Sequence, residues 1–304
     1  MKKLKGLIAA PFTPMDEIGD INYNQIETLI ELYEKNGIKG AFVGGSTGEG
    51  ASLSFNEKKS LIEAWGQLKS PKMKTLMMLG GTSLKEMQEL AIHTRQFNLD
   101  GISILSPYYY RPSSVDQLVD FCKKVAEVVP ELPFYYYHIP GLTGGNFSMA
   151  EFLKIAEYKI PNLVGIKYSS ANIMDCHLCQ NYKNGKYDIL WGVDEALLSG
   201  LSIGIEGAVG STYNYAAPLY NQIIDAFQEN NLVKAEKLQL KAVKMVELLV
   251  KYGGIGAGKA FMKLIGVDCG WFRQPVSKPT DNQVRQLKKD LEDIGFFEFC
   301  SKLS

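Results

Sequence analysis

Short apolar segments recur along most of the chain, and each is followed by a stretch with helical periodicity. In the helical stretches, such as residues 23–36 and 84–97, apolar residues recur at three- and four-residue spacing, which is typical of amphipathic helices. The apolar segments lack regular polar alternation, as expected of strands that are covered on both faces. Eight such strands are predicted, at residues 7–12, 40–44, 75–79, 101–105, 134–138, 163–167, 188–191 and 206–210.

The starts of several predicted helices carry the same polar signature. A serine is followed three residues later by Glu or Gln, so that each side chain can satisfy a backbone N–H of the other. The pairs are Ser54 and Glu57, Ser83 and Glu86, Ser114 and Gln117, and Ser148 and Glu151. Glycines at helix-to-strand joints, such as Gly37 and Gly101, are typical of helix C-termini.

Eight strand–helix units within residues 1–230 predict an α/β fold of the (β/α)8 TIM-barrel type, which typically needs about 250 residues. The alternative is a doubly wound sheet, which usually has fewer strands and a glycine-rich phosphate turn after the first. Here the first strand runs into Pro11-Phe12-Thr13-Pro14, which suits no phosphate turn. Residues 231–304 contain predicted helices but no strands, and no low-complexity linker precedes them. We therefore expect a C-terminal helical extension that packs on the barrel.

The charge balance excludes several classes of partner. Of the 304 residues, 33 are basic and 33 acidic, which argues against nucleic acid or an anionic membrane as the main partner. No apolar run approaches the roughly 20 residues of a membrane-spanning helix. The lysine-rich start at residues 1–5 is followed by too short an apolar run for a signal peptide, so we expect a mature N-terminus that leads into the first strand.

The five cysteines and three histidines predict neither a metal site nor a redox site. Cys176 and Cys179 have CxxC spacing, but no second Cys/His cluster completes a zinc site, and His93, His138 and His177 are scattered. A redox pair is expected at a helix N-terminus, whereas this pair lies inside a predicted helix. We therefore expect reduced core thiols in a cytoplasmic protein, without a metal or another cofactor.

Lys167 is the main candidate for chemistry, because it ends an apolar strand. Desolvation disfavours the ammonium form of a lysine and makes the free amine available as a nucleophile toward carbonyls. The alternative is that Lys167 simply emerges into solvent where the strand stops.

Other polar residues follow the predicted strands, at the end of a barrel where active sites lie. The glycine-rich residues 44–50 include Ser46 and Thr47 and can hold a carboxylate or phosphate, or form only a tight turn with a helix cap. Tyr137 faces the barrel axis by strand alternation, either as a proton-transferring phenol or as core filler. The adjacent acids Asp194 and Glu195 are either hydrogen-bond acceptors for a polyhydroxylated ligand or ordinary first-turn residues of a helix.

Three motifs resemble the signatures of one enzyme family. The loop at residues 44–49, the turn at residues 137–140 and the Gly165-Ile166-Lys167 strand end are similar to those of the pyruvate-dependent class I aldolases of the dihydrodipicolinate synthase / N-acetylneuraminate lyase family. The similarity spans residues 6 to about 275, with the motifs in the family's order. Residues 192–195 and 210–214 are similar to the sialic-acid-cleaving branch. The synthase branch usually has an arginine after the tyrosine turn, and residues 141–144 have none.

The resemblance implies a metal-free cleavage of sialic acid to pyruvate through a Schiff base. It implies that Lys167 forms the iminium with the keto carbon of sialic acid, and that Ser46 and Thr47 hold the adjacent carboxylate. It also implies that Tyr137 takes the proton of the C4 hydroxyl, with a relay through Ser46 and Tyr109. It also implies a sugar pocket and a homotetramer of two dimers, in which the tyrosine corresponding to Tyr109 comes from a neighbouring subunit. The implied sugar-pocket residues are Ser169, Gly192, Asp194, Glu195 and Ser211. Ile255 stands where family members place an aromatic against the acetamido group, which leaves the preference among sialic acids open.

Other functions remain open at this point. If pyruvate condenses with a different acceptor substrate, the protein is another aldolase of the same family, such as dihydrodipicolinate synthase. If the site binds a sugar acid without catalysing a reaction, the protein is a non-catalytic sugar-acid binding protein. Residues 253–260 nearly spell a phosphate-binding loop, but Ala260 replaces the required Ser/Thr and a helix precedes the segment, so we expect a helix–helix joint beside the active site. The aromatic run at residues 108–111 resembles a stacking patch for single-stranded nucleic acid, which the balanced charge disfavours.

Overall fold

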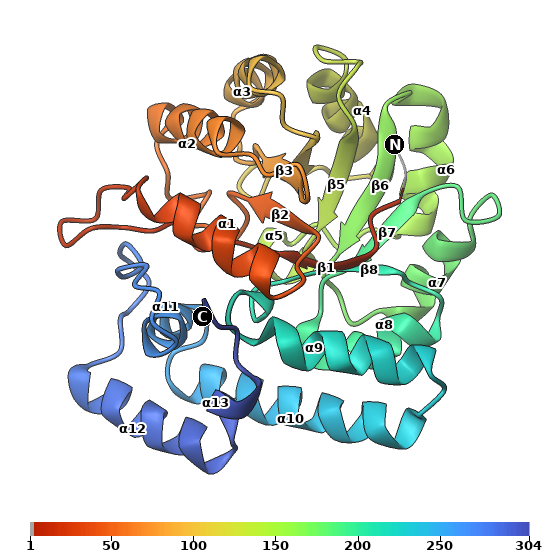
Figure 1. Cartoon of the computed structure of the whole chain (residues 1–304). Coiled ribbons are helices and arrows are strands. Elements are labelled where there is room, and N and C mark those ends of the chain that lie inside the picture. The colour runs from red at the N-terminus through yellow and green to blue at the C-terminus, as the bar shows by residue number, and fades with distance from the viewer. Residues whose placement is uncertain (1–2, 304) are drawn as a thin grey trace.

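The computed structural model describes residues 3–303, in which eight parallel strands close into a barrel surrounded by helices (Figure 1). The first two residues of the lysine-rich start lie outside the described residues. The strands are hydrogen-bonded in chain order, and the last pairs with the first, Ile8 lying opposite Val209. The strands are β1 (Gly6–Ala9), β2 (Gly40–Val43), β3 (Lys74–Met78), β4 (Gly101–Leu105), β5 (Phe134–His138), β6 (Leu163–Tyr168), β7 (Asp188–Trp191) and β8 (Gly207–Gly210).

One or two helical segments follow each strand, and further helices continue beyond the barrel. Those up to the end of the barrel are α1 (Gln25–Lys35), α2 (Phe55–Gln67), α3 (Leu84–Gln96), α4 (Val115–Ala126), α5 (Pro140–Thr143), α6 (Met149–Lys159), α7 (Ile173–Asn181), the 3-10 turn η1 (Asp194–Ala196), α8 (Leu197–Ser202) and α9 (Tyr213–Gln228). The later helices are α10 (Leu232–Lys251), α11 (Ile255–Leu264), α12 (Asp281–Asp293) and α13 (Phe296–Phe299). The predicted TIM barrel with helices after it is confirmed.

The observed strands differ from the predicted ones at their ends, and the predicted capping boxes form only in part. β1 stops at Ala9 rather than reaching residue 12, because Pro11 has no N–H to donate to a neighbouring strand. Ser54 and Glu57 form the predicted reciprocal capping box at α2. At α3, α4 and α6 only half of the predicted box forms: the serine accepts the backbone N–H three residues later, but the side chains of Glu86, Gln117 and Glu151 accept no reciprocal bond from the serine N–H. A second capping box, Thr280 with Gln283 at α12, was not predicted.

Side chains alternate between the barrel interior and the layer beneath the helices. On β5, Tyr135 and Tyr137 point into the barrel with Phe42, Leu190 and Val209. Tyr136 points outward and stacks on Phe152 of α6. The predicted alternation on this strand is confirmed. It places a phenol from β5 inside the barrel at the end where β5 and β6 finish.

The C-terminal helices pack back onto the barrel. α10 lies along α9 and contacts α12, α13 packs against α9, and α11 lies near the loops that follow β1 and β2 (Figure 1). The chain end returns to α9, where Ser301 donates its backbone N–H to the Tyr215 carbonyl at 2.8 Å. α9 itself is kinked at Ala216, two residues before Pro218, which cannot complete a regular helical hydrogen bond.

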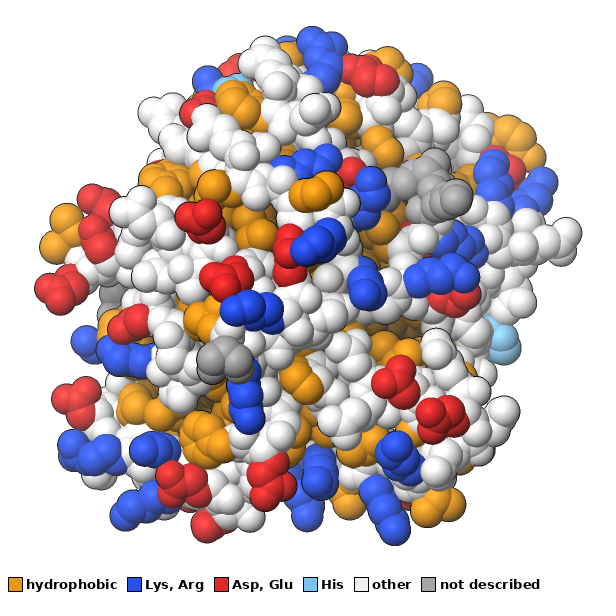
Figure 2. All heavy atoms as spheres, viewed as in Figure 1, with side chains coloured by type: hydrophobic (Ala, Val, Ile, Leu, Met, Phe, Trp, Pro, Cys, Tyr) orange, Lys and Arg blue, Asp and Glu red, His pale blue; other side chains and the backbone are white. Residues whose placement is uncertain are grey.

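The face of the molecule drawn in Figure 2 is mixed in charge. On this face, Lys and Arg side chains are interspersed with Asp and Glu and form no continuous basic stripe. Among residues 3–303, no helix combines the length and apolar character needed to cross a membrane.

Candidate active site

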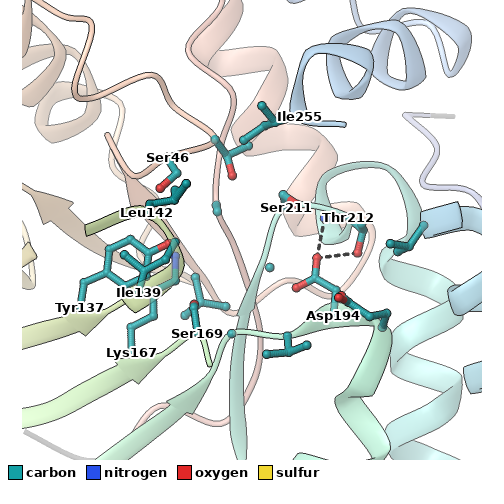
Figure 3. Close-up of a pocket in the computed structure, with 18 of the residues that line it drawn as sticks. Ser46, Tyr137, Ile139, Leu142, Lys167, Ser169, Asp194, Ser211, Thr212 and Ile255 are labelled. Carbon is teal, nitrogen blue, oxygen red and sulfur yellow. Dashed lines mark hydrogen bonds between the residues drawn. The ribbon is translucent and has the colours of Figure 1, made fainter. Parts of the chain in front are cut away.

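A pocket of about 370 Å³ opens at the carboxyl ends of the strands (Figure 3). Segments that follow β1, β2, β5, β6, β7 and β8 form its floor and sides, and α10 and α11 contribute its outer rim. Most of the predicted site residues line it together: Ser46, Thr47, Tyr137, Lys167, Ser169, Gly192, Asp194, Glu195 and Ser211. The strand-end residues thus converge as the barrel geometry requires.

Lys167 points into the barrel rather than into solvent. It lies opposite Tyr137 in the β5–β6 pairing, and the side chains lie together in Figure 3. Only 4% of Lys167 is exposed. Its Nζ lies 4.1 Å from the ring centroids of both Phe42 and Tyr137, which gives cation–π contacts to the protonated form. None of the ion pairs found within residues 3–303 involves Lys167. An amine held by aromatic rings, with no fixed counter-ion, is placed to react with a carbonyl in the pocket.

The loop after β2 brings Ser46 and Thr47 to the side of the pocket beside Tyr137. Its tight path depends on glycine: Gly44 has φ +70°, and a Cβ on Gly50 would lie 1.9 Å from the Gly44 carbonyl oxygen. The Thr13 hydroxyl fastens the loop by donating to the Gly48 carbonyl at 2.6 Å. Two hydroxyls on a fixed loop near an amine suit a carboxylate next to a carbonyl carbon.

The two predicted acids differ in their surroundings. Asp194 is buried at the base of η1, where its Oδ2 accepts hydrogen bonds from the backbone N–H and the hydroxyl of Thr212, at 2.9 and 2.7 Å. Burial raises the pKa of Asp194 to about 6, although the Thr212 hydrogen bonds oppose the rise. Glu195 is exposed at the rim. Asp194 therefore lies deeper than the mouth position expected for it, with Oδ1 left to accept a ligand hydroxyl.

Ser169 and Gly192 form a close contact between the ends of β6 and β7. Ser169 donates its N–H to the His138 carbonyl at 2.8 Å, which fixes the strand end. A Cβ at Gly192 would lie 2.0 Å from the Ser169 hydroxyl oxygen. Glycine at residue 192 is therefore what allows the Ser169 hydroxyl to stay in the pocket.

Tyr109 is not brought to the pocket of its own chain. It lies on the loop after β4, is 76% exposed and packs edge-on against Tyr110 at 5.0 Å. The predicted Ser46–Tyr109 relay is thus not assembled within one chain. A contribution of Tyr109 from a neighbouring subunit stays a prediction.

The other sequence features resolve plainly. Cys176 and Cys179 are buried and unpaired, and burial raises the pKa of the Cys176 thiol to about 12, so the prediction of core thiols is confirmed. The segment before α11 is helix α10, so the near phosphate-binding loop is the predicted helix–helix joint, and its Ile255 lines the pocket. Residues 3–303 contain no cluster of three or more His, Cys, Asp or Glu arranged to hold a metal ion.

Sequence reasoning missed part of the pocket wall. An apolar rim is formed by Val246 and Leu249 of α10 together with Leu142 of α5 and Ile255 of α11, of which Ile255 had been expected beside the pocket. Val246 and Leu249 occupy ordinary helical spacing, so nothing in the sequence separates them from core positions. The hydrogen bonds from Thr212 to Asp194 were also missed, although residues 210–214 had been recognised as a functional strand end.

Comparisons with known proteins agree with this geometry. The chain matches the Dihydrodipicolinate synthetase family over residues 3–294. It is 38% identical to an N-acetylneuraminate lyase of Rattus norvegicus, over 98% of this chain and 95% of the relative. It is 43% identical to N-acetylneuraminate lyase A of Xenopus laevis, over 95% of this chain and 98% of the relative. The solved structure of the Proteus mirabilis N-acetylneuraminate lyase superposes with a TM-score of 0.94, at 37% identity, and covers 97% of this chain and 100% of that one.

Proposed function

The chain belongs to the dihydrodipicolinate synthetase family, and on that premise we propose that it is an N-acetylneuraminate lyase, a class I aldolase that reversibly cleaves sialic acid to N-acetylmannosamine and pyruvate. The observation that carries the proposal is the buried amine of Lys167 beside the Tyr137 phenol, with the Ser46–Thr47 hydroxyls in the same pocket. In this account residues 1–230 are the catalytic barrel and residues 231–304 an extension packed on it.

Cleavage begins when the Lys167 amine attacks the keto carbon of open-chain N-acetylneuraminate. The resulting carbinolamine loses water and becomes an iminium, whose positive nitrogen draws electrons from the neighbouring carbons. Ser46 and Thr47 donate hydrogen bonds to the carboxylate beside that carbon. This fixes the keto carbon over the amine and makes the attack effectively intramolecular.

The bond between C3 and C4 breaks when the proton of the C4 hydroxyl is removed. The electron pair of the C3–C4 bond moves toward the iminium and leaves an enamine on Lys167, while C4 becomes the aldehyde carbon of N-acetylmannosamine. The Tyr137 oxygen receives the proton. Because a neutral phenol is a weak base at neutral pH, it passes its own proton on through Ser46 and the partner subunit's Tyr109. The relay returns a proton through Tyr137 to C3 of the enamine, and addition of water to the resulting iminium releases pyruvate and restores Lys167.

The sugar chain lies across the other half of the pocket. Ser169, Ser211 and the backbone at Gly192 contact its hydroxyls, which also donate to Asp194 and Glu195. A carboxylate accepts two or more such hydrogen bonds, which suits a polyhydroxylated chain. The apolar rim receives the less polar end of the substrate. The chemistry needs neither a metal nor another cofactor, because the iminium itself is the electron sink.

The assembly and location belong to the same proposal. The homotetramer built as two dimers, in which each site is completed by a neighbour, rests on the family resemblance, and the exposed Tyr109 is available for such a contact. Five unpaired cysteines support a cytoplasmic location.

Two assays on one preparation test the proposed function. We expect release of N-acetylmannosamine and pyruvate from N-acetylneuraminate, and no condensation of pyruvate with aspartate semialdehyde. Among the residues that line the pocket in the described structure there is no arginine to hold the carboxylate of that second acceptor. Condensation without cleavage would overturn the choice of substrate. Sugar-acid binding that survives Lys167→Ala, with no turnover by the intact protein, would identify a binding protein instead.

A further inference from the structure

A buried ion pair joins the loop that carries Ser46 and Thr47 to the C-terminal helices. The Lys259 ammonium of α11 lies 2.8 Å from Glu49 Oε1, and the side chains are 0% and 3% exposed. Glu49 ends the glycine-rich loop after β2, whereas Lys259 belongs to the near phosphate-binding motif that the reaction leaves unused. The two residues are separated by 210 positions in the chain. The pair therefore links the barrel to its extension beside the pocket.

Both partners are held by further contacts. The second carboxylate oxygen of Glu49 accepts the backbone N–H of Arg273 at 2.8 Å. Lys259 also donates to the Trp271 carbonyl at 3.0 Å and lies 4.9 Å from the ring centroid of Phe272. Burial lowers the pKa of Lys259, and the charge of Glu49 opposes that shift. The carboxylate on the loop and the ammonium on α11 are thus each compensated by partners inside the protein.

Stability alone is a weak reason for such a pair. Removing two charges from water is costly, and apolar replacements of similar size are often as stable or more so. Glu49 also adopts φ +59°, a left-handed conformation that is uncommon outside glycine and that occurs at ligand-binding turns. The loop therefore places a side chain in an unfavourable backbone conformation and ties it to a buried amine. Fixing the geometry of the loop accounts for both features.

Two backbone hydrogen bonds connect the ion pair to the part of the loop that lines the pocket. Glu49 lies two residues after Thr47, and its N–H donates to the Ser46 carbonyl at 3.2 Å. The next N–H, of Gly50, donates to the Gly45 carbonyl at 3.2 Å. We therefore expect a shift of Glu49 to move the turn whose hydroxyls share the pocket with Lys167. At the α11 end of the ion pair, Lys259 lies one turn after Ile255, which also lines the pocket.

We propose that Glu49 and Lys259 are positioning residues that hold the Ser46–Thr47 turn at the place where it binds the carboxylate of the 2-oxo acid. They touch no substrate and act through the turn. The inference rests on the proposed function, since it concerns the carboxylate end of the same pocket. It also explains the lysine of the near phosphate-binding motif, which binds a carboxylate of its own chain and no nucleotide.

The test compares four variants of the full-length protein: Glu49→Gln, Lys259→Met, the double variant Glu49→Gln/Lys259→Met, and the control Lys263→Met. Lys263 lies on the same helix, but its ion pair with Asp268 is half exposed. Each single variant leaves one partner buried without its counter-charge and is expected to be unstable. The double variant leaves no unpaired charge, which allows it to fold if a single variant does not. Thermal unfolding checks the fold of each.

The decisive readout is the pyruvate concentration that half-saturates reduction of the Schiff base by borohydride. For the folded double variant we expect this concentration to rise at least about tenfold, since small displacements of substrate-positioning groups have effects of that size or more. The KM for N-acetylmannosamine and the rate at saturating pyruvate should change less than about threefold, because binding at the carboxylate end is what weakens. Lys263→Met should match the wild type.

The outcomes separate the two proposals. If the wild-type protein traps pyruvate and the folded double variant traps it with unchanged half-saturation, the pair is only structural and the inference is wrong. Equal losses in pyruvate affinity, N-acetylmannosamine affinity and rate would also contradict it, because they indicate a general loss of native protein. If the wild-type protein traps no pyruvate, the proposed function fails and takes the inference with it.

Discussion

Replacing Thr212 by valine should shift the pH dependence of the reaction. Thr212 gives Asp194 two hydrogen bonds, one from its N–H at 2.9 Å and one from its hydroxyl at 2.7 Å. Thr212→Val removes the second and keeps the first, with almost no change in side-chain volume. The pKa of Asp194 already lies at about 6, because burial disfavours its charge. The loss of a donor to the ionised form should raise that pKa further.

The size of the shift follows from the bond that is lost. A hydrogen bond to a charged group contributes about 1.5–3 kcal/mol. At about 1.4 kcal/mol per pKa unit, the pKa of Asp194 should rise by about one to two units, to between about 7 and 8. A carboxyl whose pKa is higher in the folded state than in the unfolded state, where it is about 3.9, loses stability as pH rises between the two values. The variant should therefore continue to lose stability above pH 6, where the wild type has levelled off.

The assay is the pH profile of kcat/KM for N-acetylneuraminate. Because the ionised Asp194 accepts substrate hydroxyls in our account, the acidic limb of the wild-type profile should lie near pH 6, and that of Thr212→Val about one to two units higher. Urea unfolding at pH 5 and pH 8 measures the same shift without activity. The matched control is Thr82→Val, at an exposed threonine outside the pocket. An unchanged limb, or one that moves to lower pH, would refute the reasoning.

Three further substitutions test other parts of the structure. Tyr137→Phe should still form the pyruvate adduct but lose about 10²–10⁴-fold in kcat, measured by cleavage of N-acetylneuraminate, because proton transfer is removed and the amine is retained; an unchanged kcat would contradict the role of the phenol. Gly192→Ala should lower kcat/KM at least about tenfold, since a Cβ would displace the Ser169 hydroxyl that lies 2.0 Å away, and wild-type kinetics would show that this hydroxyl is dispensable. Burial lowers the pKa of His138 to about 4, so stability is lost as pH falls from about 6.5 to 4, by up to about 3 kcal/mol; His138→Asn should flatten this loss in urea unfolding at pH 7 and pH 4.5, and an unaltered slope would assign the loss to other groups.

Most of the barrel could be predicted because its signals are local. Strands such as β4 and β5 are apolar runs bounded by turn residues, and serine caps mark the starts of α2, α3, α4 and α6. These signals depend on neighbours in sequence, which the sequence contains in full. The observed strand ends differ from the predicted ones where a single residue determines where the strand stops. Pro11, for example, ends β1 before the predicted boundary.

The site could be predicted only where the fold itself brings residues together. Lys167 and Tyr137 end adjacent strands, so barrel closure alone places them side by side. The depth of Asp194 could not be foreseen, because it depends on the Thr212 hydrogen bonds across two loops. The ion pair of Glu49 and Lys259 was out of reach for the same reason, since only tertiary packing joins residues so distant in sequence. Tyr109 was predicted as a site residue, but the fold of a single chain leaves it exposed and outside the pocket.

The most direct test of the central claim is the identity of the residue that carries pyruvate. The protein would be reduced with borohydride in the presence of pyruvate, digested, and mapped by mass spectrometry, with Lys167→Ala and Lys259→Met treated in parallel. We predict a reduced pyruvate adduct on Lys167 in the wild-type protein, none in Lys167→Ala, and an adduct on Lys167 in Lys259→Met wherever that variant folds. An adduct on another lysine, or unmodified wild-type protein, would contradict the account.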